Sequence, residues 1–181
     1  RPGDGMLFCV VFNFFVESLM VDRLVPIAST LSLEHALAIS AGALALRQAH
    51  DILPLAVVVL DAGANLVSFQ REDGCGPLRF DIALGKAWGA LGMGISSRQI
   101  RDRTANRAAF QNAVAAASQG RFVPVPGGVL ILNETGEAIG AVGISGDASD
   151  RDEYCAIEAI KAAGLRAEPG EPAADWQQAP L

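Results

Sequence analysis

Residues 124–154 read PVPGGVLILNETGEAIGAVGISGDASDRDEY, and this stretch decides the fold. Two apolar runs, 128–132 and 137–145, lie on either side of the short turn sequence Asn133-Glu134-Thr135-Gly136. Apolar runs joined by a few polar residues with a glycine predict an antiparallel β-hairpin. The stretch therefore predicts two paired strands bounded by glycine-rich loops.

A helix is predicted directly after this hairpin. Ser149, followed by Asp152 three residues later, resembles a capping box with a shorter acid than usual. Gly164 is of the residue type that most often ends a helix in the left-handed conformation. We therefore expect a helix over residues 150–163. From Arg166 onward proline, glycine, alanine and glutamine dominate, which predicts an exposed tail.

The region before this stretch predicts a second hairpin among helices. Ser32 can cap a helix over residues 33–49, whose apolar residues recur at the spacing of one buried face. An apolar strand over 55–60 and a return strand over 66–71 enclose a cluster of turn residues. Further elements are a helix over 80–91, a helix capped by Ser96 or Ser97 and running to Arg107, a helix over 110–118 and a brief strand over 122–125.

Strands that follow one another through short turns pair antiparallel. The chain is therefore expected to be an α+β protein with one central antiparallel sheet of about five strands and helices packed on it. Its 181 residues suit a single domain. We divide the chain into an apolar N-terminal extension (1–20), the domain itself (21–165) and a Pro/Ala-rich C-terminal tail (166–181).

Amino-acid composition and net charge indicate which partners and which cellular compartment to expect for the protein. The 20 acidic residues exceed the 14 basic ones, and the formal net charge is −6. This charge repels a phosphate backbone, so we expect no nucleic-acid partner. Cys9, Cys75 and Cys155 are an odd number without a C-x-x-C pair, which predicts neither a disulfide framework nor a zinc site. A reducing, cytoplasmic environment suits this cysteine usage.

Residues 6–16 form an apolar run broken only by Asn13. A membrane-spanning helix needs about 20 apolar residues, so we predict no membrane span here. The run has the length of the core of a secretory signal, and export is the alternative to a cytoplasmic location, although no A-x-A cleavage site follows it. As part of a folded protein, such a segment is expected to cover a partner or its own domain.

Several short segments between about residues 31 and 164 together resemble a known family. They are LSLE at 31–34, VLDAG at 59–63, DIALGKA at 81–87, PGGV at 126–129, and GAVGISG at 140–146 with Asp152-Glu153. With these segments the chain resembles the GlcG/HbpS family of small haem-associated proteins, which includes the C-terminal domain of PduO-type corrinoid adenosyltransferases.

The resemblance implies a profilin-like sandwich, assembly as a homo-oligomer, and binding of haem or a related tetrapyrrole. Some family members are linked to haem degradation or to signalling with a sensor kinase. The apolar N-terminal extension and the C-terminal tail lie outside the resemblance.

The glycine-rich loops are candidate binding elements. Gly127, Gly128 and Gly146 could present backbone amides to an anionic group such as a propionate of the cofactor. The alternative is turn geometry and close packing on a sheet. Beside them we expect Lys86 and Glu153 to pair as a polar centre, because a buried lysine near a carboxylate can orient an anion or transfer a proton in catalysis. The alternative for this pair is an ordinary structural ion pair.

The two histidines are the candidate ligands of a haem iron. His50 lies at the end of the first helix, where histidine complements the helix dipole without any further role. His35 lies off the buried row of the same helix, and we predict it as the metal and cofactor ligand, with a ligand shared across an oligomer interface as one arrangement.

Three hypotheses for function follow. The first is a homo-oligomeric binding protein for haem or a similar planar anionic small molecule. The second is an enzyme acting on a small organic acid, with Lys86 and Glu153 as its catalytic residues. The third is an accessory subunit that docks on a larger protein complex through its N-terminal apolar segment.

Overall fold

The protein is described here by a computed structural model of residues 25–181, so the predicted N-terminal extension lies outside the described residues. Five strands form one sheet in the order β2-β1-β4-β3-β5, and every neighbouring pair is antiparallel. The predicted α+β class with five antiparallel strands is confirmed. The strands are β1 (Ala56–Asp61), β2 (Leu66–Arg71), β3 (Gly128–Leu132), β4 (Ala138–Ser145) and β5 (Arg166–Glu168).

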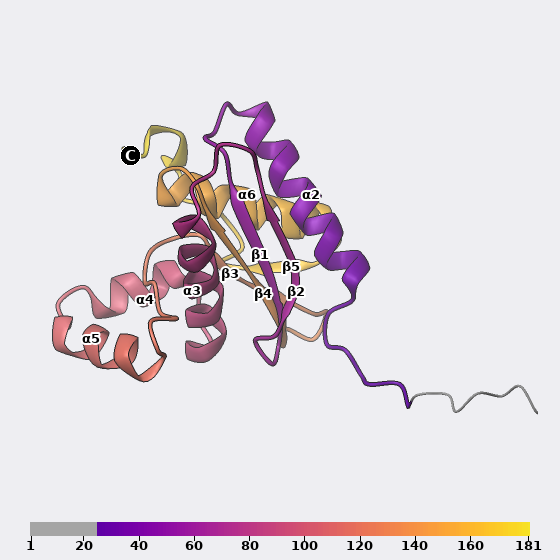
Figure 1. Cartoon of the computed structure of the whole chain (residues 1–181), viewed down its shortest axis with the longest axis horizontal. Coiled ribbons are helices and arrows are strands. Elements are labelled where there is room, and N and C mark those ends of the chain that lie inside the picture. The colour runs from indigo at the N-terminus through magenta and orange to yellow at the C-terminus, as the bar shows by residue number, and fades with distance from the viewer. Residues whose placement is uncertain (1–24) are drawn as a thin grey trace, which may run out of the picture.

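Helices cover both faces of the sheet (Figure 1). Helices α2 (Leu33–Ala49) and α6 (Ser149–Ala162) pack on each other and on one face, whereas α3 (Leu78–Met93) packs on the other face. Two short helices, α4 (Ser97–Thr104) and α5 (Ala108–Ala117), lie beside α3, and a single 3-10 turn, η1 (Trp176–Gln178), follows near the C-terminus. Within residues 25–181 no helix is long and apolar enough to cross a membrane.

Strand β1 lies between two apolar cores, one on each face of the sheet. Alternate residues of a strand point to opposite faces. Val57 and Val59 accordingly join the core under α2 and α6, and Val58 and Leu60 join the core under α3. All four side chains are fully buried, which is why the strand reads as an unbroken apolar run.

Glycine allows α3 to lie close to β4. A Cβ atom at Gly143 would collide with the backbone carbonyl of Ala83. This close approach brings the next turn of α3, with Lys86, directly to the end of the sheet.

The helix ends test the predicted caps. Ser32 and Ser96 cap their helices as predicted. The side-chain oxygen of each serine accepts a hydrogen bond from the backbone N–H three residues later in the chain. Gly164 has the predicted left-handed conformation, with φ of 78°. The capping box at Ser149 is wrong, because α6 begins at Ser149 and has no side-chain cap. The carboxylate of Asp152 instead accepts a hydrogen bond from the backbone N–H of Asp147.

Two predictions about loops are corrected. Residues 122–125 form a loop and not a strand, and Phe122 is buried there against Gly89 of α3. Residues 166–168, which we expected in an exposed tail, form β5 and pair with β3. Three residues are too short for a strand pattern to be visible in the sequence. Their pairing with β3 depends on where the chain leaves the end of α6.

Candidate functional site

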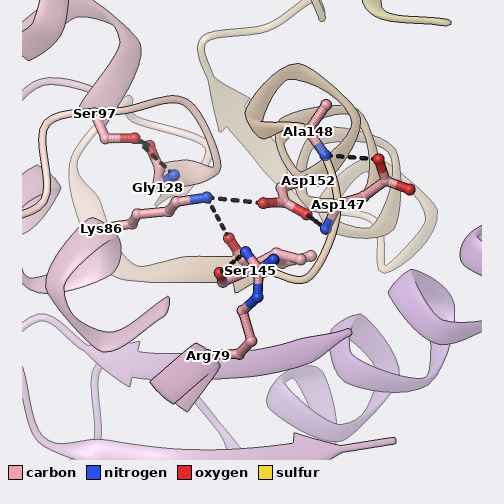
Figure 2. A network of polar contacts seen from close by, with 9 residues as sticks. Arg79, Lys86, Ser97, Gly128, Ser145, Asp147, Ala148 and Asp152 are labelled. Atoms are coloured by element: carbon pink, nitrogen blue, oxygen red, sulfur yellow. Dashed lines mark hydrogen bonds and ion pairs between the residues drawn. The ribbon is translucent and has the colours of Figure 1, made fainter. Parts of the chain in front are cut away.

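Lys86 is the centre of a buried polar network at the end of the sheet (Figure 2). Its side chain is 2% exposed. The Nζ atom donates to Asp152 Oδ2 at 2.8 Å and to the backbone oxygen of Ile144 at 2.8 Å. The predicted pairing of Lys86 with Glu153 is therefore corrected: its partner is the neighbouring acid, Asp152, since this is the residue of the first turn of α6 that faces the sheet.

Asp152 connects this lysine to the loop before α6. Its Oδ1 atom accepts the N–H of Asp147 at 3.1 Å. Asp147 in turn accepts the N–H of Leu53 at 2.8 Å and faces Arg151 at 3.2 Å. Burial raises the pKa of Asp152, and the ammonium group of Lys86 opposes that rise most strongly. The network ties the loop at Leu53, strand β4 and helix α6 together.

Glu153 lies next to this network but has a different partner. Its side chain is 0% exposed, and Arg98 Nε of α4 lies 3.3 Å from Oε2. That distance allows an ion pair, but the geometry does not make a hydrogen bond, and neither oxygen has a hydrogen-bond partner among the described residues. Burial raises the pKa of Glu153 to about 7, and Arg98 is the main opposing influence. This carboxyl group can therefore exchange a proton near neutral pH.

Two of the predicted glycines pack against Lys86. A Cβ atom at Gly127, whose φ is 112°, would lie 2.9 Å from Lys86 Nζ, and one at Gly128 would collide with the Lys86 carbonyl. The N–H of Gly128 already donates to Ser97 Oγ at 2.7 Å. Gly146 is separate from them, because its Cβ position is blocked by the Pro54 carbonyl. Close packing, which we considered as the alternative, explains all three glycines.

Sequence reasoning missed Arg98 and Asp147. Arg98 is one of four arginines within residues 98–107, a pattern typical of a solvated helix face, and its contact with Glu153 depends on how α4 packs. The ion pair between Asp147 and Arg151 has the i,i+4 spacing that is visible in sequence, but Asp147 precedes the helix and is read as loop.

The two histidines differ in which ring nitrogen is occupied. His35 is exposed in the first turn of α2, and its Nδ1 atom lies 3.0 Å from Ser32 Oγ. No described residue bonds its Nε2 atom. His50, at the end of α2, has its Nε2 atom 2.8 Å from the hydroxyl of Tyr154. Within residues 25–181 no group of three or more His, Cys, Asp or Glu side chains is arranged to hold a metal ion.

Cavities open at several places on the described surface. An apolar one of about 210 Å³ lies between α3 and α5, an apolar groove of about 450 Å³ lies between α2 and α6, and a polar one of about 390 Å³ lies beside His50. None of these three is lined by Lys86, Glu153 or His35.

Residues 31–161 match the model of the family called Haem degrading protein HbpS-like. The chain belongs to the HbpS-like family. The predicted family resemblance is thereby confirmed, and the match covers both hairpins and all the helices that build the polar network. The chain is 33% identical over 109 residues to an uncharacterized 15.0 kDa protein in the dhaT-dhaS intergenic region of Citrobacter freundii; the alignment covers 60% of this chain and 75% of that protein.

Three solved structures have a similar fold. The PduOC:heme complex superposes with a TM-score of 0.67 at 23% identity, over 78% of this chain and 99% of that one. The ORFY protein of Klebsiella pneumoniae gives a TM-score of 0.69 at 23% identity, over 80% and 97% of the two chains. HbpS gives 0.60 at 21% identity, over 80% and 94%. At these identities the likeness concerns the fold.

Proposed function

We propose that this protein binds haem or a closely related tetrapyrrole, with His35 as an axial ligand of the iron. The chain belongs to the HbpS-like family, and one protein of the same fold was solved as a haem complex. The observation that carries the proposal is the state of His35, an exposed imidazole whose Nδ1 is held by Ser32 while Nε2 has no described partner.

The bond to Ser32 prepares His35 for a metal. A histidine that ligates a metal through one nitrogen usually donates a hydrogen bond from the other, and this second bond fixes the tautomer and the ring orientation. In His35 the donor to Ser32 Oγ would be Nδ1–H, which leaves the lone pair of Nε2 for the iron. In His50 the Nε2 atom is already bonded to Tyr154, so the structure favours His35 between the two histidines.

An exposed histidine holds the iron but does not enclose the tetrapyrrole ring. Exposed apolar side chains accompany His35 along the chain: Leu33 is 58% exposed, and Val25 and Ile27 are 85% and 91% exposed. The other wall of the site would come from a second copy of the chain, consistent with the homo-oligomer that we predicted, or from the apolar segment 6–16. Oligomerisation is thus part of the proposal, because one protomer supplies only one side.

The catalytic role predicted for Lys86 and Glu153 stays a prediction, and so does anion binding by Gly127, Gly128 and Gly146. The contacts of Lys86 and the glycines are those of a structural core: the Lys86 ammonium donates to Asp152 and to the Ile144 carbonyl, and the glycines pack closely on Lys86 and on backbone atoms. We therefore place the proposed haem at the surface of α2 and not at the polar network.

Absorbance and electron paramagnetic resonance of the full chain titrated with ferric haem test the proposal. Wild-type protein is expected to shift the Soret band and give an imidazole-ligated spectrum with saturable stoichiometry. His35→Ala should abolish the imidazole signature, whereas the matched variant His50→Ala should retain it. Ser32→Ala should keep ligation but weaken haem binding, by roughly tenfold, the lower end of the range for a lost outer-shell partner of a metal ligand.

The readout must separate ligation from non-specific adsorption, since haem adheres to apolar surfaces. A spectrum unchanged by His35→Ala, or one lost equally in His50→Ala, contradicts the assignment of the ligand. Absence of any saturable Soret shift in the wild-type chain contradicts haem binding itself.

A further inference from the structure

The polar cavity at the end of α2 has the size of a small-molecule site. Its volume is about 390 Å³, within the range of sites that bind small ligands. It is lined by His50, Asp51, Ile52, Arg151, Trp176 and Gln177. Trp176 and Gln177 come after residues 31–161, the part of the chain that the family model matches. The C-terminal segment therefore completes a cavity that the family match does not account for.

Aromatic stacking fixes the wall of this cavity. Trp176 stacks on Tyr154 with ring centroids 3.7 Å apart and an angle of 7° between the planes. His50 meets both rings edge-on, with centroids 5.1 and 5.3 Å away. The C-terminal segment is held beside α6 by a further hydrogen bond, from Arg151 Nη2 to the backbone oxygen of Gln177 at 2.9 Å (Figure 1). The wall is thus a set of interlocked side chains from three separate parts of the chain.

His50 and Arg151 bring nitrogen donors to the lining. Tyr154 occupies Nε2 of His50, which leaves Nδ1. Burial raises the pKa of Tyr154, so its hydroxyl stays protonated and can donate to Nε2. In the tautomer in which the Tyr154 hydroxyl donates to Nε2, Nδ1 of His50 carries the ring proton, as it also does in the doubly protonated ring. Arg151 is the second donor, and its Nη1 and Nη2 atoms are already held by Asp147 and Gln177, so the guanidinium has a fixed position.

Asp51 is the acidic group of the cavity lining. Its φ of 53° places it in the left-handed region, which aspartate and asparagine tolerate better than most residues. Arg151 forms its ion pair with Asp147. No ion pair within residues 25–181 includes Asp51. The cavity therefore combines an uncompensated carboxylate with two fixed donors, His50 and Arg151.

We propose that this cavity binds a small zwitterion of the free amino acid type. Its ammonium group would pair with Asp51, its carboxylate would accept hydrogen bonds from His50 Nδ1 and Arg151, and its side chain would lie against Trp176 and Ile52. A molecule with only one of the two charges satisfies only part of this lining. The site is separate from His35, so it does not depend on the proposed haem function.

Isothermal titration calorimetry of the full chain tests the proposal, with the twenty common L-amino acids as probes. At least one is expected to bind saturably at up to millimolar concentration. L-alanine is then compared with its two halves, propionate and ethylammonium, and each half is expected to bind at least tenfold more weakly than a zwitterion of the same size, because one charge-assisted contact is missing. No saturable binding by any of the twenty overturns the proposal.

Substitutions of Asp51 and His50 test which side chains of the cavity bind the zwitterion. Asp51→Asn keeps a residue that tolerates the left-handed conformation, and it should weaken the best zwitterion by roughly tenfold to a hundredfold. His50→Gln should do the same. Asp73→Asn and His35→Gln change the same residue types outside the cavity and should leave the affinity unchanged. Equal losses in the control pair, or equal binding of zwitterion and half-molecules, contradict the proposed recognition. Haem spectra of His50→Gln, expected to be those of wild type, keep the two sites distinguishable.

Discussion

Replacement of Lys86 by methionine is the most direct test of the buried network. Methionine retains most of the apolar stem but removes the ammonium group, so Asp152 Oδ2 and the Ile144 carbonyl both lose their donor. The lysine is 1% exposed and the aspartate 0% exposed, so water does not replace the lost contacts in the folded state. Breaking a buried pair from one side costs about 3–5 kcal/mol. For a chain of this length the melting temperature should fall by about 6–20 °C.

The loss should depend on pH. Lys86 opposes the burial that raises the pKa of Asp152, so in the variant this pKa rises further above its ordinary value of 3.8. A carboxyl group whose pKa is raised by folding favours the folded state at low pH and loses that contribution as pH rises through its folded pKa. The deficit of Lys86→Met relative to wild type is therefore expected to be largest near neutral pH and to shrink toward pH values near 4.

Urea unfolding of wild type and variant at about pH 8 and about pH 5 measures this difference. The double variant Lys86→Met/Asp152→Asn is the matched control, because it removes the uncompensated charge while the asparagine oxygen can still accept the N–H of Asp147. It should recover roughly 1–3 kcal/mol of the loss. A loss below about 1 kcal/mol, the value of an exposed pair, would refute the reasoning, as would a double variant no more stable than the single one.

Two further predictions concern stability. Folding raises the pKa of Glu153 from 4.5 to about 7, so the wild-type free energy of unfolding should fall by about 3 kcal/mol as pH rises across this window. Glu153→Gln should remove this pH dependence in urea titrations, and parallel pH profiles of the variant and the wild type would contradict the prediction. Gly143→Ala should destabilise by about 1–3 kcal/mol or more, since its Cβ meets the Ala83 carbonyl, whereas Gly76→Ala, with open space around it, should be neutral within about 1 kcal/mol. Equal melting temperatures of the two alanine variants would contradict the second prediction.

Most regular elements could be predicted from local patterns. Helix α2 follows from Ser32 and the apolar row behind it, and the hairpin β3–β4 follows from the polar turn at 133–136 between apolar runs. These are short-range properties, in which cap, period and turn residue all lie within a few positions of one another. Strand β5 was missed for the opposite reason: its residues lack a pattern, and its pairing with β3 is a long-range event.

The candidate site divides in the same way. The sequence indicated that Lys86, Gly127, Gly128 and the acids of α6 belong together, and the structure places them together. It could not show which acid meets the lysine, because adjacent residues of a helix point about 100° apart and only the orientation of α6 on the sheet decides which faces inward. The same orientation directs Glu153 toward Arg98.

The sequence by itself determined the fold class, the positions of the two hairpins, the small residues at which backbone must approach backbone, and the family. All of these rest on residue type and spacing along the chain. Only the tertiary structure decided that Lys86 pairs with Asp152, that Tyr154 occupies Nε2 of His50 while Nε2 of His35 is left without a described partner, and that the C-terminal segment closes a cavity beside His50. Those outcomes depend on distances between segments as far apart in sequence as His50, Tyr154 and Trp176, which are set only when the helices and the tail pack on the sheet.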